Sequence, residues 1–304
     1  MGEPVPESTL PYPPIYKDKK FVVLSDWDGT ITTCDSNDYM TDNLGYGKDK
    51  RRQGNLDILS GRATFRDAFR EMLESISANG HTFEECKEVL RQNISLDAGF
   101  KAFYAWCKAN DIPVIIVSSG MTPTIRAVLS NLVGEDDAKD IDIISNDVDI
   151  HADGTWRIKF RHPTRYVSSR RLRALMRRAT RQAPRARWAL LPPTTHDAWL
   201  ILSYASRSGY GHDKSHAILP YRDLPDPPVL FFFGDGVSDM SAARHADVLF
   251  VKEKPGGDND LAAYCRREGI KHVLFDDFAA ALPVVQAVVE GKKTTAEVLD
   301  AGKA

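Results

Sequence analysis

The sequence predicts an α/β fold with a parallel sheet, on the strength of two observations. Short runs of Val, Ile, Leu and Phe recur along the chain, at residues 21–26, 113–119, 142–147, 228–235 and 247–252. Runs that are apolar throughout are typical of strands that helices cover on both faces. Segments with helical periodicity, such as 121–133 and 238–245, lie between these runs. Strands that alternate with helices in this way predict a doubly wound core.

One helical segment interrupts this alternation directly after the first predicted strand. Residues 35–108 contain no strand-like run. Within them, "TFRDAFREMLESISANG" and "TFEECKEVLRQNI" each open with a threonine, a favoured N-cap, and repeat apolar residues every three or four positions. Ligands of α/β sheets bind at the carboxyl ends of the strands. We therefore expect a helical cap, inserted after the first strand, over that edge of the sheet.

These patterns divide the chain into an arm, a core, a cap and a tail. The expected parts are a Pro-rich N-terminal arm (1–20), a core (21–34 and 109–285), the helical cap (35–108) and a C-terminal tail (286–304). The arm has no apolar stretch of the kind found in secretory signals, and no run approaches the roughly 20 apolar residues that span a bilayer. We expect no membrane segment.

The charge and the cysteines narrow the class of protein further. The net charge of the 304 residues is −2, so the chain as a whole lacks the basic character of nucleic-acid-binding proteins. Its four cysteines are scattered and form no CxxC pair. Unpaired thiols suit a reducing compartment. We therefore predict a cytoplasmic protein without a nucleic-acid partner, and its oligomeric state stays open.

Residues 167–210 differ sharply in composition from the rest of the chain. They hold nine arginines, no lysine and a single acid, Asp197, so this segment carries +8 and the remainder −10. Three interpretations stay open. The segment is a basic docking element for RNA or acidic lipid, a solvated helix followed by a loop, or a retained intron that is translated.

Two aspartates separated by one residue follow the first predicted strand, in "FVVLSDWDGTITTCD" (21–35). A tight turn explains Asp28 before Gly29, but it does not explain Asp26 at the mouth of a buried strand. Two like charges so close together repel each other unless a cation or a proton lies between them. The pattern therefore predicts a cation, a proton or both at this point.

Other polar residues stand at or near the ends of the later predicted strands. They are Ser118, Ser119, Gly120, Lys214, Asp235 and Asp239. Because parallel strands end at one edge of a sheet, we expect them to share a crevice with Asp26 and Asp28. A carboxylate can accept a phosphoryl group, and a second carboxyl group can act as acid and base. Oxygen ligands suit Mg²⁺, while a lysine and a serine turn suit phosphate oxygens. The set predicts phosphoryl transfer.

The ordered motifs "DWDGT", "SSG", a lysine and "GDGVSD" resemble those of the haloacid dehalogenase (HAD) superfamily of phosphatases, over about residues 20–285. The chain is most similar to the phosphoserine phosphatase branch, and within it to hydroxyketo-methylthiopentenyl phosphate phosphatases and fungal small-metabolite phosphatases. The resemblance implies a Rossmann-like core, a helical cap and Mg²⁺. The roles that it implies are nucleophile for Asp26, acid and base for Asp28, phosphate binding for Ser118 and Lys214, metal binding for Asp26, Asp28 and Asp235, and support for Thr30 and Asp239.

The sequence departs from the family pattern in three places. Ser119 stands where many relatives have glycine, so it is a second candidate for Ser118's role. Asp35 stands where phosphoserine phosphatases place a substrate-binding glutamate, although an N-cap explains it equally well. Ser118 and Lys214 lie 96 positions apart, about double the family spacing, and removing residues 167–210 would leave 52.

Several weaker candidates have an ordinary structural explanation. Arg62 and Arg66 of the cap fit a solvated helix face better than a substrate contact. Asn146 and Asp147 fit a strand-end turn as well as a site, and the histidines near the lysine, His162 and His212, are not needed for the chemistry. His196 lies within the Arg-rich segment.

We therefore predict a Mg²⁺-dependent phosphomonoesterase acting on a small phosphorylated metabolite through an aspartyl-phosphate. The alternatives are a strict phosphoserine phosphatase or phosphotransferase, and an inactive isoform or anion-binding protein that uses the Arg-rich segment.

Overall fold

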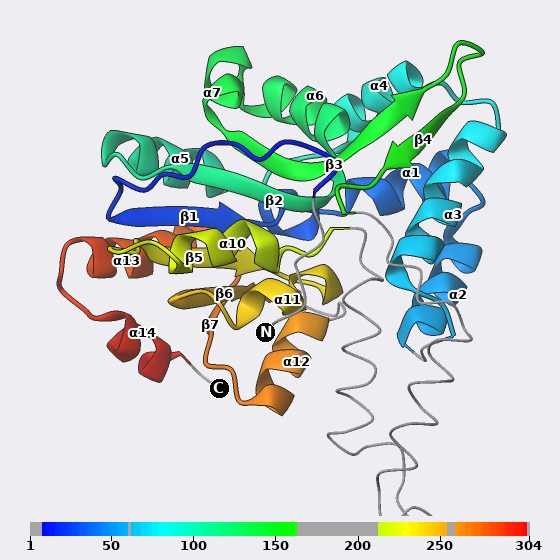
Figure 1. The fold of residues 1–304 in the computed structure, drawn as a ribbon. Coiled ribbons are helices and arrows are strands. Elements are labelled where there is room, and N and C mark those ends of the chain that lie inside the picture. Colours follow the sequence, from blue (N-terminus) through cyan, green and yellow to red (C-terminus); the bar gives the residue numbers. More distant parts are fainter. Residues whose placement is uncertain (1–7, 60–61, 163–211, 254–258, 303–304) are drawn as a thin grey trace, which may run out of the picture.

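A seven-stranded sheet forms the centre of the protein (Figure 1). This computed structural model describes residues 8–59, 62–162, 212–253 and 259–302. The strand order is β4-β3-β2-β1-β5-β6-β7. The strands are β1 (Phe21–Ser25), β2 (Val114–Met121), β3 (Asp142–Ile150), β4 (Trp156–Lys159), β5 (Val229–Gly234), β6 (Val248–Lys252) and β7 (Val273–Phe275). All neighbours pair in parallel except β3 and β4, which are antiparallel. The predicted parallel α/β core is confirmed.

The chain reverses direction across the sheet at β1. It passes from β1 to β2 and β3 on one side, and returns to the other side of β1 through β5. Val23 of β1 therefore aligns with Val114 on one side and with Phe231 on the other. Such a reversal leaves a crevice at the carboxyl end of the central strand.

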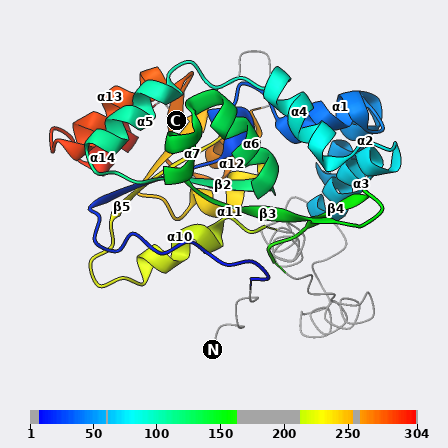
Figure 2. The same cartoon turned by 90° about the horizontal axis from the view of Figure 1, so that it is seen from above.

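Alternate residues of the strands pack against helices on opposite faces of the sheet. Val22 and Leu24 belong to one buried cluster with α10 (Ser215–Arg222), α11 (Met240–Ala243) and α12 (Asp260–Glu268). Val23 belongs to the other, with α5 (Phe100–Ala109), α6 (Thr122–Val133), α7 (Glu135–Asp140), α13 (Phe278–Val289) and α14 (Thr295–Ala301). Figure 2 shows α10 and α13 on opposite sides of the sheet. Burial on both faces explains the nearly continuous apolar runs of β1, β5 and β6.

Four helices gather beyond one end of the sheet (Figures 1 and 2). They are α1 (Ser36–Leu44), α2 (Lys48–Leu59), α3 (Phe65–Ala78) and α4 (Phe83–Asn93). Thr64 and Thr82 cap α3 and α4 as expected, each accepting from a main-chain N–H three residues on. Trp156 of β4 joins these helices to the sheet, since its indole N–H donates to the His81 carbonyl at 3.0 Å.

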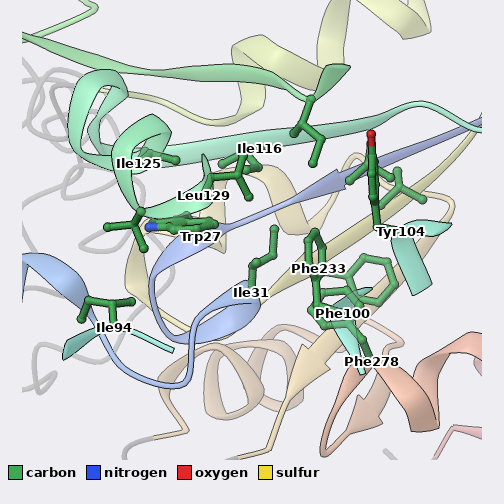
Figure 3. Close-up of a cluster of buried hydrophobic side chains, with 14 of the residues drawn as sticks. Trp27, Ile31, Ile94, Phe100, Tyr104, Ile116, Ile125, Leu129, Phe233 and Phe278 are labelled. Atoms are coloured by element: carbon green, nitrogen blue, oxygen red, sulfur yellow. The ribbon is translucent and has the colours of Figure 1, made fainter. Parts of the chain in front are cut away.

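The structure differs from the expected elements in several details. Strands β2 and β3 run on to Met121 and Ile150, and the expected helix at 238–245 is a short turn followed by α11. The sequence does not predict β4 and β7, because four and three residues are too short to give a pattern. Helix α5, placed in the expected cap, packs against α13, where Phe100 and Phe278 lie with ring centroids 5.2 Å apart (Figure 3).

The N-terminal arm lies against the sheet from residue 8 onward. The Thr9 N–H donates to the Arg161 carbonyl at 2.7 Å, and the Tyr16 hydroxyl donates to Asp142 at 2.7 Å. The Arg161 guanidinium donates in turn to the carbonyls of Leu10 and Pro11. The expected Arg-rich segment, 167–210, lies outside the described residues.

All four cysteines lie in the described part of the chain. No disulfide joins them, and three of the four are buried. Of the helices that the structure describes, none has the length and apolar character needed to cross a membrane.

Candidate active site

The turn after β1 presents Asp26 and Asp28 at the carboxyl end of the central strand. Asp26 accepts from the Trp27 N–H at 2.7 Å, which fixes the start of the turn Trp27–Ile31. The Trp27 side chain is fully buried, in the cluster that also holds Ile116 (Figure 3). Gly29 adopts a φ of +75°, a backbone conformation that strains other residues, which explains the glycine after Asp28.

Three hydrogen bonds from the first turn of α1 hold the Asp28 carboxylate. One oxygen accepts from the Ser36 N–H at 2.8 Å and from the Ser36 hydroxyl at 2.5 Å. The other accepts from the Asn37 side-chain amide at 2.8 Å. Burial, followed by the nearby charge of Asp35, raises the pKa of Asp28 to about 8. Asp28 is therefore suited to carry a proton near neutral pH.

Lys214 lies between two of the predicted acids. Its Nζ is 2.6 Å from an Asp26 oxygen and 2.7 Å from an Asp239 oxygen, and its side chain has no exposed surface. Burial alone would lower the pKa of Lys214, but Asp239 and Asp26 raise it, so the lysine stays charged. A buried ammonium is tolerated only when it is paired in this way.

Asp235 and Asp239 complete an acidic cluster beside Asp26. One oxygen from each lies within 4.8 Å of the others. The Asp239 oxygen that does not contact Lys214 accepts from the N–H groups of Asp235 and Gly236 at 3.1 Å each, and Thr30 donates to Asp235 at 3.1 Å. Burial, followed by the charge of Asp239, raises the pKa of Asp26 well above its usual range. Three carboxylates facing one ammonium favour a further cation.

The last part of β2, where its pairing with β3 is irregular between Val117 and Met121, supplies the remaining predicted residues, 118–120. The Gly120 N–H donates to the Ser118 hydroxyl at 2.9 Å. His212 Nδ1 lies 2.8 Å from the Ser118 carbonyl oxygen, so it is the nitrogen that carries the proton. The Asn146 amide donates to the Ser119 carbonyl at 2.7 Å. Both carbonyls are thus held, and the Ser119 hydroxyl is buried with no partner among the described residues.

Gly120 allows this part of β2 to lie close to Asp28. A Cβ atom on Gly120 would lie 3.3 Å from the Ser118 hydroxyl, from an Asp28 oxygen and from the Asn37 amide nitrogen. The structure therefore brings together residues from the predicted strand ends: Asp26, Asp28, residues 118–120, Lys214, Asp235 and Asp239.

The weaker candidates have other contacts. Asp35 caps α1, accepting from the N–H groups of Asn37 and Asp38 at 2.8 and 2.9 Å. Arg62 pairs with Asp57 on the surface at 2.6 Å. Arg66 donates to the His162 carbonyl at 2.7 Å. Asp147 accepts from the Val148 N–H at 2.9 Å.

Sequence reasoning missed three residues that support the site. Ser36 and Asn37 hold Asp28, and the buried Lys252 donates to the Thr30 carbonyl at 2.9 Å. The only signal for the first two is their position at a helix start after the "DWDGT" motif. Lys252 ends a buried strand, a position where a lysine needs a partner.

Comparisons with known proteins identify the family of this chain. A family model of haloacid dehalogenase-like hydrolases matches residues 23–190. The chain is 40% identical to Pdp3-interacting factor 1 of Schizosaccharomyces pombe, over 86% of this chain and 93% of the relative. It is 38% identical to the polyol phosphate phosphatase PYP1 of Saccharomyces cerevisiae, over 92% of this chain and 99% of the relative.

A solved structure of similar fold is a phosphoserine phosphatase from T. onnurineus. Its TM-score is 0.50 at 14% identity, over 90% of this chain and 97% of that one. The match agrees with the Rossmann-like core described above. This chain belongs to the family of haloacid dehalogenase-like hydrolases.

Proposed function

We propose that this chain is a Mg²⁺-dependent phosphomonoesterase that forms an aspartyl-phosphate at Asp26. The observation that carries the proposal is the buried Lys214 ammonium, 2.6 Å from Asp26 and 2.7 Å from Asp239. It holds the nucleophilic carboxylate in place and offers positive charge to an approaching phosphate dianion. A protein that only binds anions would have no use for a carboxylate at this position.

The acidic cluster suits a magnesium ion by its donor chemistry. The oxygens of Asp26, Asp235 and Asp239 lie within 4.8 Å of one another, and Mg²⁺ prefers oxygen ligands. Asp26 and Asp235 would hold the ion together with the main-chain carbonyl of Asp28, while Asp239 orients Lys214. Bound there, Mg²⁺ supplies charge that lowers the repulsion between Asp26 and the phosphate.

The residues act in two steps. An Asp26 oxygen forms a bond to phosphorus, the bond from phosphorus to the ester oxygen breaks, and Asp28 gives its proton to that oxygen. A pKa of about 8 keeps this proton available near neutral pH. Water then attacks phosphorus, Asp28 takes a proton from the water, and the bond to Asp26 breaks to release phosphate. The Ser118 hydroxyl, together with main-chain N–H groups where β2 leads into α6, binds the other phosphate oxygens.

We further propose a small polyol phosphate as the substrate, because a relative that is 38% identical over 92% of the chain is named a polyol phosphate phosphatase. Strict phosphoserine hydrolysis is the competing substrate proposal. A small-molecule substrate without a nucleic-acid partner, and a cytoplasmic location, stay proposals that rest on the composition and the cysteine pattern.

Phosphate release from a panel of small phosphomonoesters tests this proposal. We expect release with Mg²⁺, loss of release with EDTA, and loss in Asp26→Asn, which keeps the side-chain shape but removes the nucleophile. Cys34→Ser changes an exposed side chain outside the acidic cluster, so it is the control and should retain activity. Activity that survives in Asp26→Asn would contradict the mechanism.

A further inference from the structure

The Asn37 side chain lies beside both Asp28 and residues 118–120, the proposed phosphate-binding segment. It is 2% exposed, and its Nδ2 donates to an Asp28 oxygen at 2.8 Å. The same Nδ2 would lie 3.3 Å from a Cβ atom on Gly120, as would the Ser118 hydroxyl. The amide therefore stands beside the place where the ester oxygen of a bound substrate would meet Asp28.

The orientation of this amide leaves one polar atom unused. The NH₂ group of Asn37 donates to one lone pair of an Asp28 oxygen, and the other lone pair can carry the proton that Asp28 gives to the ester oxygen. The amide oxygen is then directed away from Asp28. That oxygen, Oδ1, is buried and has no hydrogen-bond partner among the residues that the structure describes. Unpaired buried acceptors are uncommon, and one at a site calls for a functional explanation.

We propose that Asn37 selects the substrate, its Oδ1 accepting a hydrogen bond from a hydroxyl group on the carbon next to the phosphorylated carbon. This inference rests on the proposed function. The ester oxygen would meet Asp28, which Nδ2 contacts at 2.8 Å, and a hydroxyl on the neighbouring carbon lies about one hydrogen-bond length from that ester oxygen. The other end of the same amide, Oδ1, is therefore a suitable acceptor for it. A polyol phosphate provides this donor, and an ester of a simple alcohol does not.

The consequence is discrimination against substrates that lack the hydroxyl. A site built to bond a substrate hydroxyl rejects the analogue without it, because the buried acceptor is then left unpaired. We expect kcat/KM to differ by about 10- to 100-fold between the two.

The test compares glycerol 1-phosphate with the monophosphate of 1,3-propanediol, which has the same length and charge but no hydroxyl on the second carbon. The unaltered chain should prefer glycerol 1-phosphate by the stated factor. In Asn37→Ala the preference should fall to near one. Ser36→Ala is the matched control, since it removes another bond to Asp28 from the same turn. It should slow both substrates and keep their ratio.

The outcomes separate this inference from the proposed function. Hydrolysis of p-nitrophenyl phosphate, lost in Asp26→Asn, tests the phosphatase alone. If that activity is present but the two alcohol phosphates react equally with the unaltered chain, or the preference survives in Asn37→Ala, the inference is overturned. Equal rates for the two alcohol phosphates in the unaltered chain overturn the inference even if Asn37→Ala does not fold. Absence of activity on every ester would overturn the proposed function and this inference with it.

Discussion

The buried pair of Lys252 and Asp97 offers a sharp test of how the site is supported. Lys252 pairs with Asp97 and also donates to the Thr30 carbonyl at 2.9 Å. The two side chains are only 9% and 3% exposed. Asp97 also accepts from the N–H groups of Gly99 and Phe278 at 3.0 Å each, at the starts of α5 and α13.

Asp97→Asn should destabilise the protein by about 3–5 kcal/mol, because it leaves a buried ammonium without its countercharge. The asparagine keeps an oxygen for Gly99 and Phe278, so the change isolates the charge. Replacing both partners, as Asp97→Asn with Lys252→Met, removes the unpaired ammonium and should recover most of the loss.

The free energy of unfolding, measured by urea titration with tryptophan fluorescence, provides the assay. Lys271→Met is the control, since Lys271 pairs with Asp300 while both side chains are 62% exposed, and it should cost under about 1 kcal/mol. If the double variant is as unstable as Asp97→Asn, or if Asp97→Asn costs no more than the control, the reasoning is wrong.

Three further predictions concern packing, capping and pH. Gly234→Ala should abolish phosphatase activity, since the new Cβ would lie 2.6 Å from the Asp239 carboxyl carbon; full activity would contradict this geometry. Thr82→Ala should lower the free energy of unfolding by about 1 kcal/mol, because it removes the capping box with Glu85, and a denaturation curve unchanged from the parent would count against it. Burial, followed by the charge of His216, lowers the pKa of His162 to about 4. In the unfolded chain His162 has the ordinary pKa of histidine, so between that pH and about pH 4 the unfolded state binds more protons than the folded state. The free energy of unfolding therefore falls as the pH is lowered through this range. His162→Gln should lessen the loss measured between about pH 7.5 and about pH 5, and an equal loss in both proteins would refute this cause.

The sequence predicts the residues of the candidate site better than the residues that support them. Asp26, Ser118 and Asp235 follow apolar runs, and the rule that parallel strands end at one edge is enough to bring them together. No comparable rule covers Ser36 and Asn37, because which polar residues of a helix's first turn face an acid depends on how that helix is placed. The placement comes from packing between distant segments, which a local pattern does not contain.

In the fold, too, local sequence patterns predict some elements, and packing between distant segments determines the others. Strands buried on both faces have long apolar runs, whereas β4 pairs at the edge of the sheet and alternates buried with exposed residues over only four positions. The sequence groups helix α5 with the cap because it is helical and precedes β2. Its aromatic side chains reach α13, far along the chain, and only the tertiary structure could show that contact.

Arg161 connects the described part of the N-terminal arm to residues 118–120, the proposed phosphate-binding segment. Arg161 donates from its side chain to the carbonyls of Leu10 and Pro11, and from its main chain to the Asn146 side chain at 2.9 Å. Asn146 in turn donates to the Ser119 carbonyl. A shortened protein that begins at the first strand would keep every proposed catalytic residue but lose the hydrogen bonds from Arg161 to Leu10 and Pro11. When the amino terminus is shortened or tagged, we therefore expect the affinity for phosphate to change before any other property of the site.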